Sequence, residues 1–199
     1  MGENPDDNPH GYQVVQDVYC YPGTNILINK NDLRSENDLC ELEKAMTFAR
    51  SSEVFPDGDF SVAHYCTIHH HLFQDVYEWA GRFRTVRIAK DETAFCFPEH
   101  LSDQMHLLFS ELREKEYLTS RSKREFAAQA AWFLAELNAL HPFREGNGRA
   151  QSLFLALLAV HAGYPLDMER LDPDAFRSAM IQSFHGNRES LTDEIEKLI

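Results

Sequence analysis

The sequence predicts a mainly α-helical domain of about seven helices with one small β-hairpin. Apolar residues recur at helical spacing through most of the chain, often just after a residue that can cap a helix. β-Branched residues flank a short polar turn in one place only, residues 82–97. A length of 199 residues with 43% hydrophobic residues is sufficient for one buried core.

The first two helices are located by their caps. Asn31 or Asp32 can cap a helix whose apolar residues continue to Ala49. Ser61 can cap a second helix, whose apolar face continues toward Gly81, a residue type that commonly ends helices. The hairpin of residues 82–97 is expected to follow directly.

The second half of the chain carries five further helix signals. Pro98 suits the first turn of a helix, and Ser122 with Glu125 forms a capping box. A nearly continuous apolar run from Arg149 to Ala162 predicts a buried helix that ends at Gly163. The last two helices are expected to start at Asp172-Pro173 and at Asn187 or Ser190.

Composition and charge exclude several classes of protein. The chain carries 32 acidic against 19 basic residues, which argues against non-specific binding to nucleic acid. No apolar run approaches the roughly 20 residues that span a bilayer, and the N-terminus does not resemble a signal peptide. Four scattered cysteines predict reduced thiols in a cytoplasmic protein. We expect a tail at residues 1–19 and one domain at residues 20–199.

The chemistry is concentrated between the two most strongly predicted helices. Gly146 and Gly148 let backbone N–H groups approach a phosphate at the start of a helix. Arg149 adds a forked cation, Glu145 is a hard oxygen ligand suited to Mg²⁺, and His141 is a base near neutral pH. These residue types favour a phosphate site, although a helix stop followed by a simple turn explains them about equally well.

The same stretch resembles the signature of the Fic (filamentation induced by cAMP) family. Its sequence, His-Pro-Phe-Arg-Glu-Gly-Asn-Gly-Arg from residue 141, matches the family motif His-x-Phe-x-(Asp/Glu)-Gly-Asn-Gly-Arg-x-x-Arg. Tyr21-Pro22-Gly23-Thr24 and the stretch from Leu72 to Gly81 also resemble segments of bacterial Fic toxins and effectors. The hairpin resembles the family's flap. The resemblance covers roughly residues 20 to 198, and it implies a Fic-fold helical bundle.

This resemblance implies an enzyme that transfers AMP from ATP to a tyrosine, threonine or serine hydroxyl of a target protein. His141 would take the hydroxyl proton, and Glu145 would hold Mg²⁺. Phe143 would anchor the loop in the core. The residues implied in nucleotide binding are Phe143, Gly146, Asn147, Gly148, Arg149 and the motif's last position, Ser152. The flap residues implied in holding the target by strand addition are Lys90, Asp91, Glu92, Thr93 and Phe95.

Ser152 departs from the motif, which has arginine at this position. In the family that arginine contacts the γ-phosphate, and a serine cannot supply its charge. Two alternatives to ATP-dependent transfer therefore stay open: a catalytically weakened Fic-like binding protein, and a Fic enzyme that uses a different nucleotide donor.

The resemblance also implies partners. Small bacterial toxins of the family modify type II topoisomerases, and secreted effectors modify small GTPases, so the protein is expected in the bacterial cytoplasm or translocated into a host cell. Family members are restrained by a glutamate helix, from their own chain or from a small antitoxin. Ser190 to Glu194 comes close to that helix motif, but we favour an ordinary acidic terminal helix and a separate antitoxin.

Three other features invite functional interpretations. Residues 69–71 are three consecutive histidines, which point in three directions on a helix and so are poor ligands for one metal ion. Cys96 could be a nucleophile, but its aromatic neighbours favour ordinary packing. The arginines and lysine of residues 82–90 indicate either a solvated strand edge or a surface for an acidic ligand.

Overall fold

The computed structural model describes residues 17–90 and 93–199 of the chain. These residues form seven α-helices and one two-stranded antiparallel sheet. The helices are α1 (Glu36–Ser51), α2 (Val62–Phe73), α3 (Pro98–Glu114), α4 (Lys123–Leu140), α5 (Asn147–Ala162), α6 (Pro173–Phe184) and α7 (Glu189–Leu198). The strands are β1 (Ala89–Lys90) and β2 (Thr93–Ala94), and 3₁₀ turns occupy Glu116–Leu118 and Met168–Arg170. The predicted fold class is therefore confirmed.

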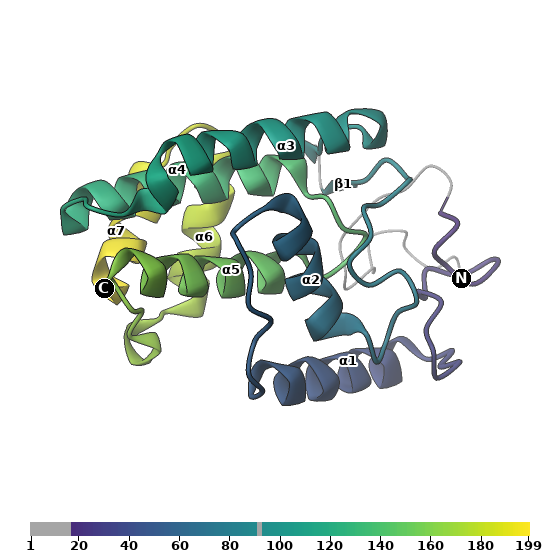
Figure 1. Cartoon of the computed structure of the whole chain (residues 1–199). Coiled ribbons are helices and arrows are strands. Elements are labelled where there is room, and N and C mark those ends of the chain that lie inside the picture. Colours follow the sequence, from purple (N-terminus) through teal and green to yellow (C-terminus); the bar gives the residue numbers. More distant parts are fainter. Residues whose placement is uncertain (1–16, 91–92) are drawn as a thin grey trace.

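Helix α4 lies at the centre of the bundle. It packs against α3, α5, α6 and α7, while α2 packs against α1, α3 and α5. As a result α1 and α2 lie at one end of the molecule and α6 and α7 at the other (Figure 1). The shared core is rich in aromatic side chains that are almost fully buried, among them Tyr65, Phe109, Phe126, Phe133, Phe143 and Phe154.

Several helix boundaries follow the local signals in the sequence. The Ser122 hydroxyl accepts a hydrogen bond from the Glu125 amide, and the Glu125 carboxylate accepts one from the Ser122 amide, so the capping box is present. Pro98 starts α3, Asp172 caps α6, and Gly163 ends α5 in a left-handed conformation. These ends therefore coincide with local sequence signals: capping side chains at Ser122 and Asp172, proline at position 98 and glycine at position 163.

The predicted start of α1 and the predicted end of α2 were wrong. Helix α1 is capped by Ser35, and the earlier Asn29 side chain holds the preceding turn by accepting from the Leu33 amide. Helix α2 ends at Phe73 instead of continuing toward Gly81. The carbonyl of Val76 accepts a hydrogen bond from the Lys30 amide, and a continued helix would use that carbonyl internally.

The predicted hairpin is present but short. Ala89 pairs with Ala94 and Lys90 with Thr93, so the connection is residues 91–92, which lie outside the described residues. The rest of residues 82–97 makes few ladder bonds, because Arg84 takes the carbonyls of Val86 and Cys96. No helix among the described residues is long and apolar enough to cross a membrane.

Candidate active site

The 141–149 loop joins the end of α4 to the start of α5. His141 is the last residue held by α4, in a left-handed conformation with φ 48° and ψ 61°. Inside the loop, the Asn147 side chain accepts from the Phe143 amide at 2.9 Å and donates to the Phe143 carbonyl at 2.8 Å. Phe143 is completely buried. The loop is therefore fixed both by its own hydrogen bonds and by an aromatic anchor.

The imidazole of His141 lies between α4 and the hairpin segment. Its Nδ1 is 3.1 Å from the carbonyl oxygen of Asn138. Because a carbonyl can only accept, Nδ1 carries the proton in the neutral ring, and the lone pair is on Nε2. Phe95 stacks on the ring with a centroid distance of 4.0 Å. The orientation of this base is thus set from two sides.

Gly146 forms the turn into α5. Its φ is +79°, and a Cβ atom added there would lie 2.2 Å from the Phe73 ring, so glycine is required for both conformation and space. Its amide donates to Glu145 Oε1 at 2.8 Å. Helix α5 therefore begins with its amides and its positive dipole end beside the Glu145 carboxylate.

Arg149 is held in place from several directions. Its Nη2 is 2.5 Å from Glu43 Oε1 and 3.3 Å from Glu145 Oε1, and its guanidinium lies over the Phe73 ring. The Tyr77 hydroxyl donates to the other oxygen of Glu43 at 2.5 Å. Burial alone would lower the pKa of Arg149, but the two carboxylates outweigh it and keep this pKa above its ordinary value. With 37% of its side chain exposed, Arg149 is a preoriented cation within reach of a ligand.

A second arginine of the loop is fully interior. Arg144 is 2% exposed and forms an ion pair with Asp17, with Nη2 2.6 Å and Nε 2.9 Å from Asp17 Oδ2. The Cys20 thiol donates to the same carboxylate oxygen. This contact fixes the segment before α1 against the loop.

Arg84 connects the hairpin segment to the loop. Its buried guanidinium donates to the carbonyls of Val86 and Cys96 on one side. On the other side it donates to the carbonyls of Leu140, at 3.1 Å, and His141, at 2.8 Å. The positions of Phe95 and His141 are therefore linked through one side chain.

The structure brings most of the predicted site residues together. His141, Phe143, Glu145, Gly146, Asn147 and Arg149 share the loop and the first turn of α5, and Phe95 contacts His141. Gly148 and Ser152 are exposed on α5. Lys90 and Thr93 pair through their backbones, while Asp91 and Glu92 lie outside the described residues.

The remaining candidates do not form a second site among the described residues. The three histidines diverge: His69 is buried, His70 is exposed, and His71 bonds the Arg50 carbonyl. Burial raises the pKa of the Cys96 thiol, which disfavours a thiolate nucleophile.

The sequence analysis did not assign four polar residues that contact the loop to this site: Asp17, Glu43, His69 and Arg84. Glu43 and His69 leave a usable signal, because each is a polar residue on the apolar face of a helix. Glu43 follows Leu39 by one helical turn, and His69 lies one turn from Tyr65 and from Phe73.

A magnesium ion associated with a phosphate substrate fits this loop. Glu145 could supply one hard carboxylate ligand, and the described residues contain no group of three or more His, Cys, Asp or Glu side chains that could hold a metal by themselves. Such a donor set suits Mg²⁺ that takes its other ligands from phosphates and water.

Comparison with known proteins gives consistent matches. The model of the Fic/DOC family matches residues 59–159. "Probable protein adenylyltransferase y4lH" of Sinorhizobium fredii is 48% identical over 94% of this chain and 98% of its own length. "Protein adenylyltransferase VbhT" of Bartonella schoenbuchensis is 34% identical, but the aligned region covers only 40% of that protein. The BepC effector of Bartonella tribocorum, solved with bound AMPPNP, superposes with a TM-score of 0.81 and 27% identity over 90% of this chain and 95% of BepC.

Proposed function

Because the chain belongs to the Fic/DOC family, we propose that it is a protein adenylyltransferase that transfers AMP from ATP to a hydroxyl side chain of a target protein. The observation that carries this proposal is the 141–149 loop. It holds a base with its lone pair on Nε2 at one end, and an oriented cation and a helix N-terminus at the other.

The chemistry assigned to the loop is a displacement at the α-phosphorus. The target hydroxyl oxygen forms a bond to this phosphorus as the bond to the β-phosphate bridging oxygen breaks, and pyrophosphate leaves. His141 Nε2 takes the hydroxyl proton. The α5 amides and Arg149 stabilise the added negative charge on the phosphate oxygens. The AMP is left on the target as a phosphodiester.

Glu145 is the residue that would hold Mg²⁺ in this reaction. When bound, the ion supplies positive charge to the nucleotide phosphates. The carboxylate of Glu145 is kept beside the start of α5 by its contacts with the Gly146 amide and with Arg149.

The hairpin is suited to holding the target segment. It has two strands of two residues each, so their outer edges can accept another extended chain through backbone bonds. Such pairing needs little side-chain complementarity and would bring a hydroxyl toward His141, against which Phe95 is stacked. Lys90, Asp91, Glu92, Thr93 and Phe95 are the flap residues proposed for this role.

Ser152 does not change the assignment of ATP as donor. It is exposed on α5, one helical turn after Arg149, and Arg149 remains as an oriented cation. A relative with 48% identity named as a probable adenylyltransferase supports ATP over the two alternatives, a weakened binding protein or another nucleotide donor.

The partners are proposed at a coarser level. The target is a protein with an accessible hydroxyl, a type II topoisomerase if the chain acts as a toxin in the bacterial cytoplasm. It is a small GTPase if the chain acts as an effector in a host cell, as the effector neighbour suggests. A small antitoxin with an inhibitory glutamate helix is the proposed restraint.

Intact-mass spectrometry of a purified candidate target tests the proposal. After incubation with the protein, ATP and Mg²⁺, the target should gain the mass of one AMP on a serine, threonine or tyrosine. A gain that corresponds to a different group would favour another donor. A mass that stays unchanged across targets, together with tight target binding, would favour the binding protein.

A further inference from the structure

His69 is a buried histidine with two specific hydrogen bonds to the segments around the candidate active site. Its ring is fully buried on α2 and lies between two aromatic rings, 3.7 Å from the Phe143 centroid and 4.6 Å from that of Phe73. Both rings also shape the loop, since Phe143 anchors it and Phe73 lies against Gly146. His69 is therefore part of the floor beneath the loop.

The two ring nitrogens of His69 bond different segments. The Gly81 amide donates to Nδ1 at 2.9 Å, where the chain leaves the turns after α2 and enters the hairpin segment. Nε2 is 2.9 Å from the carbonyl oxygen of Glu145, 76 residues later in the chain. One imidazole therefore joins α2, the start of the hairpin segment and the loop.

These bonds define one chemical form of the ring. Nδ1 accepts from an amide, so it carries no proton, whereas Nε2 faces a carbonyl and must donate. The ring is thus neutral with its proton on Nε2.

We propose that His69 is a positioning residue for Glu145, and that its Nε2–H bond to the Glu145 carbonyl sets the place of the carboxylate that would hold Mg²⁺. The bond is made to the backbone of the residue whose side chain is the ligand. Because Gly146 follows directly and is fixed against Phe73, a shift of the Glu145 carbonyl would move the carboxylate and the first amides of α5 together. This inference rests on the proposed function.

Two substitutions separate the roles of the two nitrogens. Glutamine can place an amide N–H near the position of Nε2, so His69→Gln can keep the bond to Glu145. Asparagine reaches only as far as Nδ1, so His69→Asn can keep the bond from Gly81 but not the one to Glu145. Both substitutions remove the imidazole ring that stacks on Phe73 and Phe143, so the two variants lose the same ring contacts. His70→Asn, in the exposed neighbour, is the control for the substitution itself.

The test is calorimetric titration with ADP, which is not turned over, in the presence of Mg²⁺ and again in EDTA. We expect Mg²⁺ to strengthen ADP binding by the wild-type protein and by His70→Asn equally. In His69→Asn this gain should shrink by about tenfold, because losing a group that hydrogen-bonds to a metal ligand typically weakens metal binding by about 10- to 100-fold. ADP binding in EDTA should change little. His69→Gln should retain most of the gain.

The outcomes are distinguishable. An undiminished Mg²⁺ gain in folded His69→Asn would overturn the inference, and so would equal losses in the two His69 variants. A wild-type protein that binds no nucleotide would instead contradict the proposed function itself. Should His69→Asn fail to fold, the ¹⁵N spectrum of the wild-type histidines decides: a neutral ring protonated on Nε2 is expected, and a charged ring or an Nδ1–H form would overturn the inference.

Discussion

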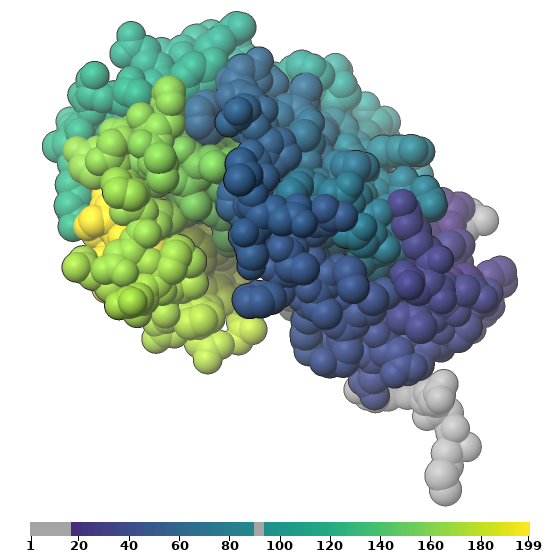
Figure 2. All heavy atoms as spheres, turned by 60° about the horizontal axis from the view of Figure 1, so that its bottom comes forward, coloured from purple at the N-terminus to yellow at the C-terminus, as the bar shows by residue number. Residues whose placement is uncertain are grey.

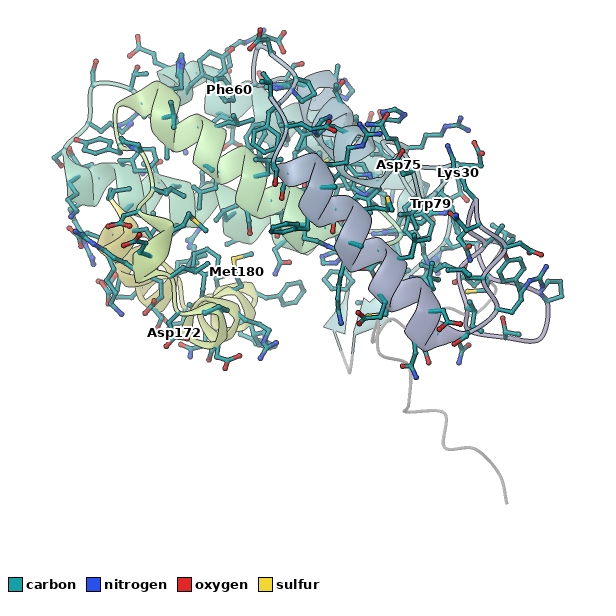
Figure 3. All side chains as sticks on the ribbon, turned by 90° about the horizontal axis from the view of Figure 1, so that it is seen from below. Lys30, Phe60, Asp75, Trp79, Asp172 and Met180 are labelled. Carbon is teal, nitrogen blue, oxygen red and sulfur yellow. The ribbon has the colours of Figure 1, made fainter. Side chains whose placement is uncertain are left out.

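The two ends of the molecule hold their arginines in different ways. Beside the 141–149 loop, Arg144 is 2% exposed and forms an ion pair with Asp17. At the α6–α7 end, Arg124 meets three carboxylates of α7, but its side chain is 43% exposed. The two regions lie apart in the molecule. Figure 2 shows α1 in blue-purple and the C-terminal residues in green to yellow on different parts of one face. Figure 3 shows Trp79 and Asp172 in opposite halves of the view.

This difference in exposure changes what an ion pair contributes to stability. An exposed pair is screened by water and contributes about 0–1 kcal/mol. A buried pair is costly to form because both charges lose water. Removing one partner is strongly destabilising, because the other charge is then left in the interior. The loop end thus uses charges to fix geometry, and the α6–α7 end uses them mainly to cover a helix surface.

Asp17→Asn should produce the largest loss of stability. The substitution removes the Asp17 charge from beside the buried Arg144 guanidinium, so the free energy of unfolding should fall by about 3–5 kcal/mol. Urea unfolding followed by circular dichroism measures this. Asp32→Asn is the matched control, because it breaks an exposed arginine pair of the same residue types. Similar losses in the two variants would refute the contrast between buried and exposed pairs.

Ser152→Arg tests whether an added exposed charge at the loop end acts on the ligand. Position 152 lies one turn after Arg149 on α5, so a guanidinium there can reach the same phosphate tail. ATP binding should strengthen by about 1.5–3 kcal/mol, with ADP binding nearly unchanged. Calorimetric titration with each nucleotide in Mg²⁺ gives both numbers. Equal gains for ATP and ADP would indicate general attraction instead of a γ-phosphate contact.

The buried His69 should make stability depend on pH. Its pKa falls from the ordinary 6.5 to about 3 in the folded protein, so the folded state resists taking up a proton that the unfolded chain accepts. The associated stability is fully present above pH 6.5 and is lost progressively as the pH falls toward 3. The loss should reach about 2 kcal/mol by pH 5, at roughly 1.4 kcal/mol per pH unit.

His69→Gln isolates this effect, since glutamine does not titrate. The difference in unfolding free energy between wild type and His69→Gln should shrink as the pH falls from 6.5 to 5. A difference that stays constant over this range would show that His69 titrates normally in the folded protein.

Arg124→Gln should have the smallest effect. Although it removes contacts with Glu189, Asp193 and Glu196, all of these groups are at the surface. We expect the free energy of unfolding to fall by at most about 1 kcal/mol in low salt. The loss should be smaller in about 0.5 M salt, because dissolved ions screen the attraction between exposed charges. Thermal unfolding at the two salt concentrations checks both the size and the salt dependence.

Helix ends could be predicted from the sequence where the cap is local, as at Ser122 with Glu125 and at Asp172. The start of α1 was predicted wrongly although its cap is also local, because Asn31 and Asp32 are alternative cap residues just before Ser35. Helix α2 ends at Phe73, and just beyond it the Val76 carbonyl bonds the Lys30 amide, a contact that no local pattern encodes.

The candidate site divides in the same way. The residues expected to do chemistry lie in one segment and were identified together, because this segment resembles the Fic motif as well as a loop that could bind an anion at the start of a helix. The residues that hold them come from distant segments. Glu43 and His69 stand out only as polar residues on apolar helix faces, and Asp17 precedes the first predicted helix in a segment without periodicity.

The most direct test of the central claim follows the two ends of ATP separately. The wild-type protein and His141→Ala are incubated with Mg²⁺, a bacterial lysate or a purified candidate target, and ATP labelled at either the α- or the γ-phosphate. Acid-stable label on protein should come from the α-phosphate only. His141→Ala should lower the rate of incorporation by about 10²- to 10⁴-fold in protein that circular dichroism shows to be folded. Label from the γ-phosphate, or equal α-labelling by His141→Ala, would contradict AMP transfer by this loop.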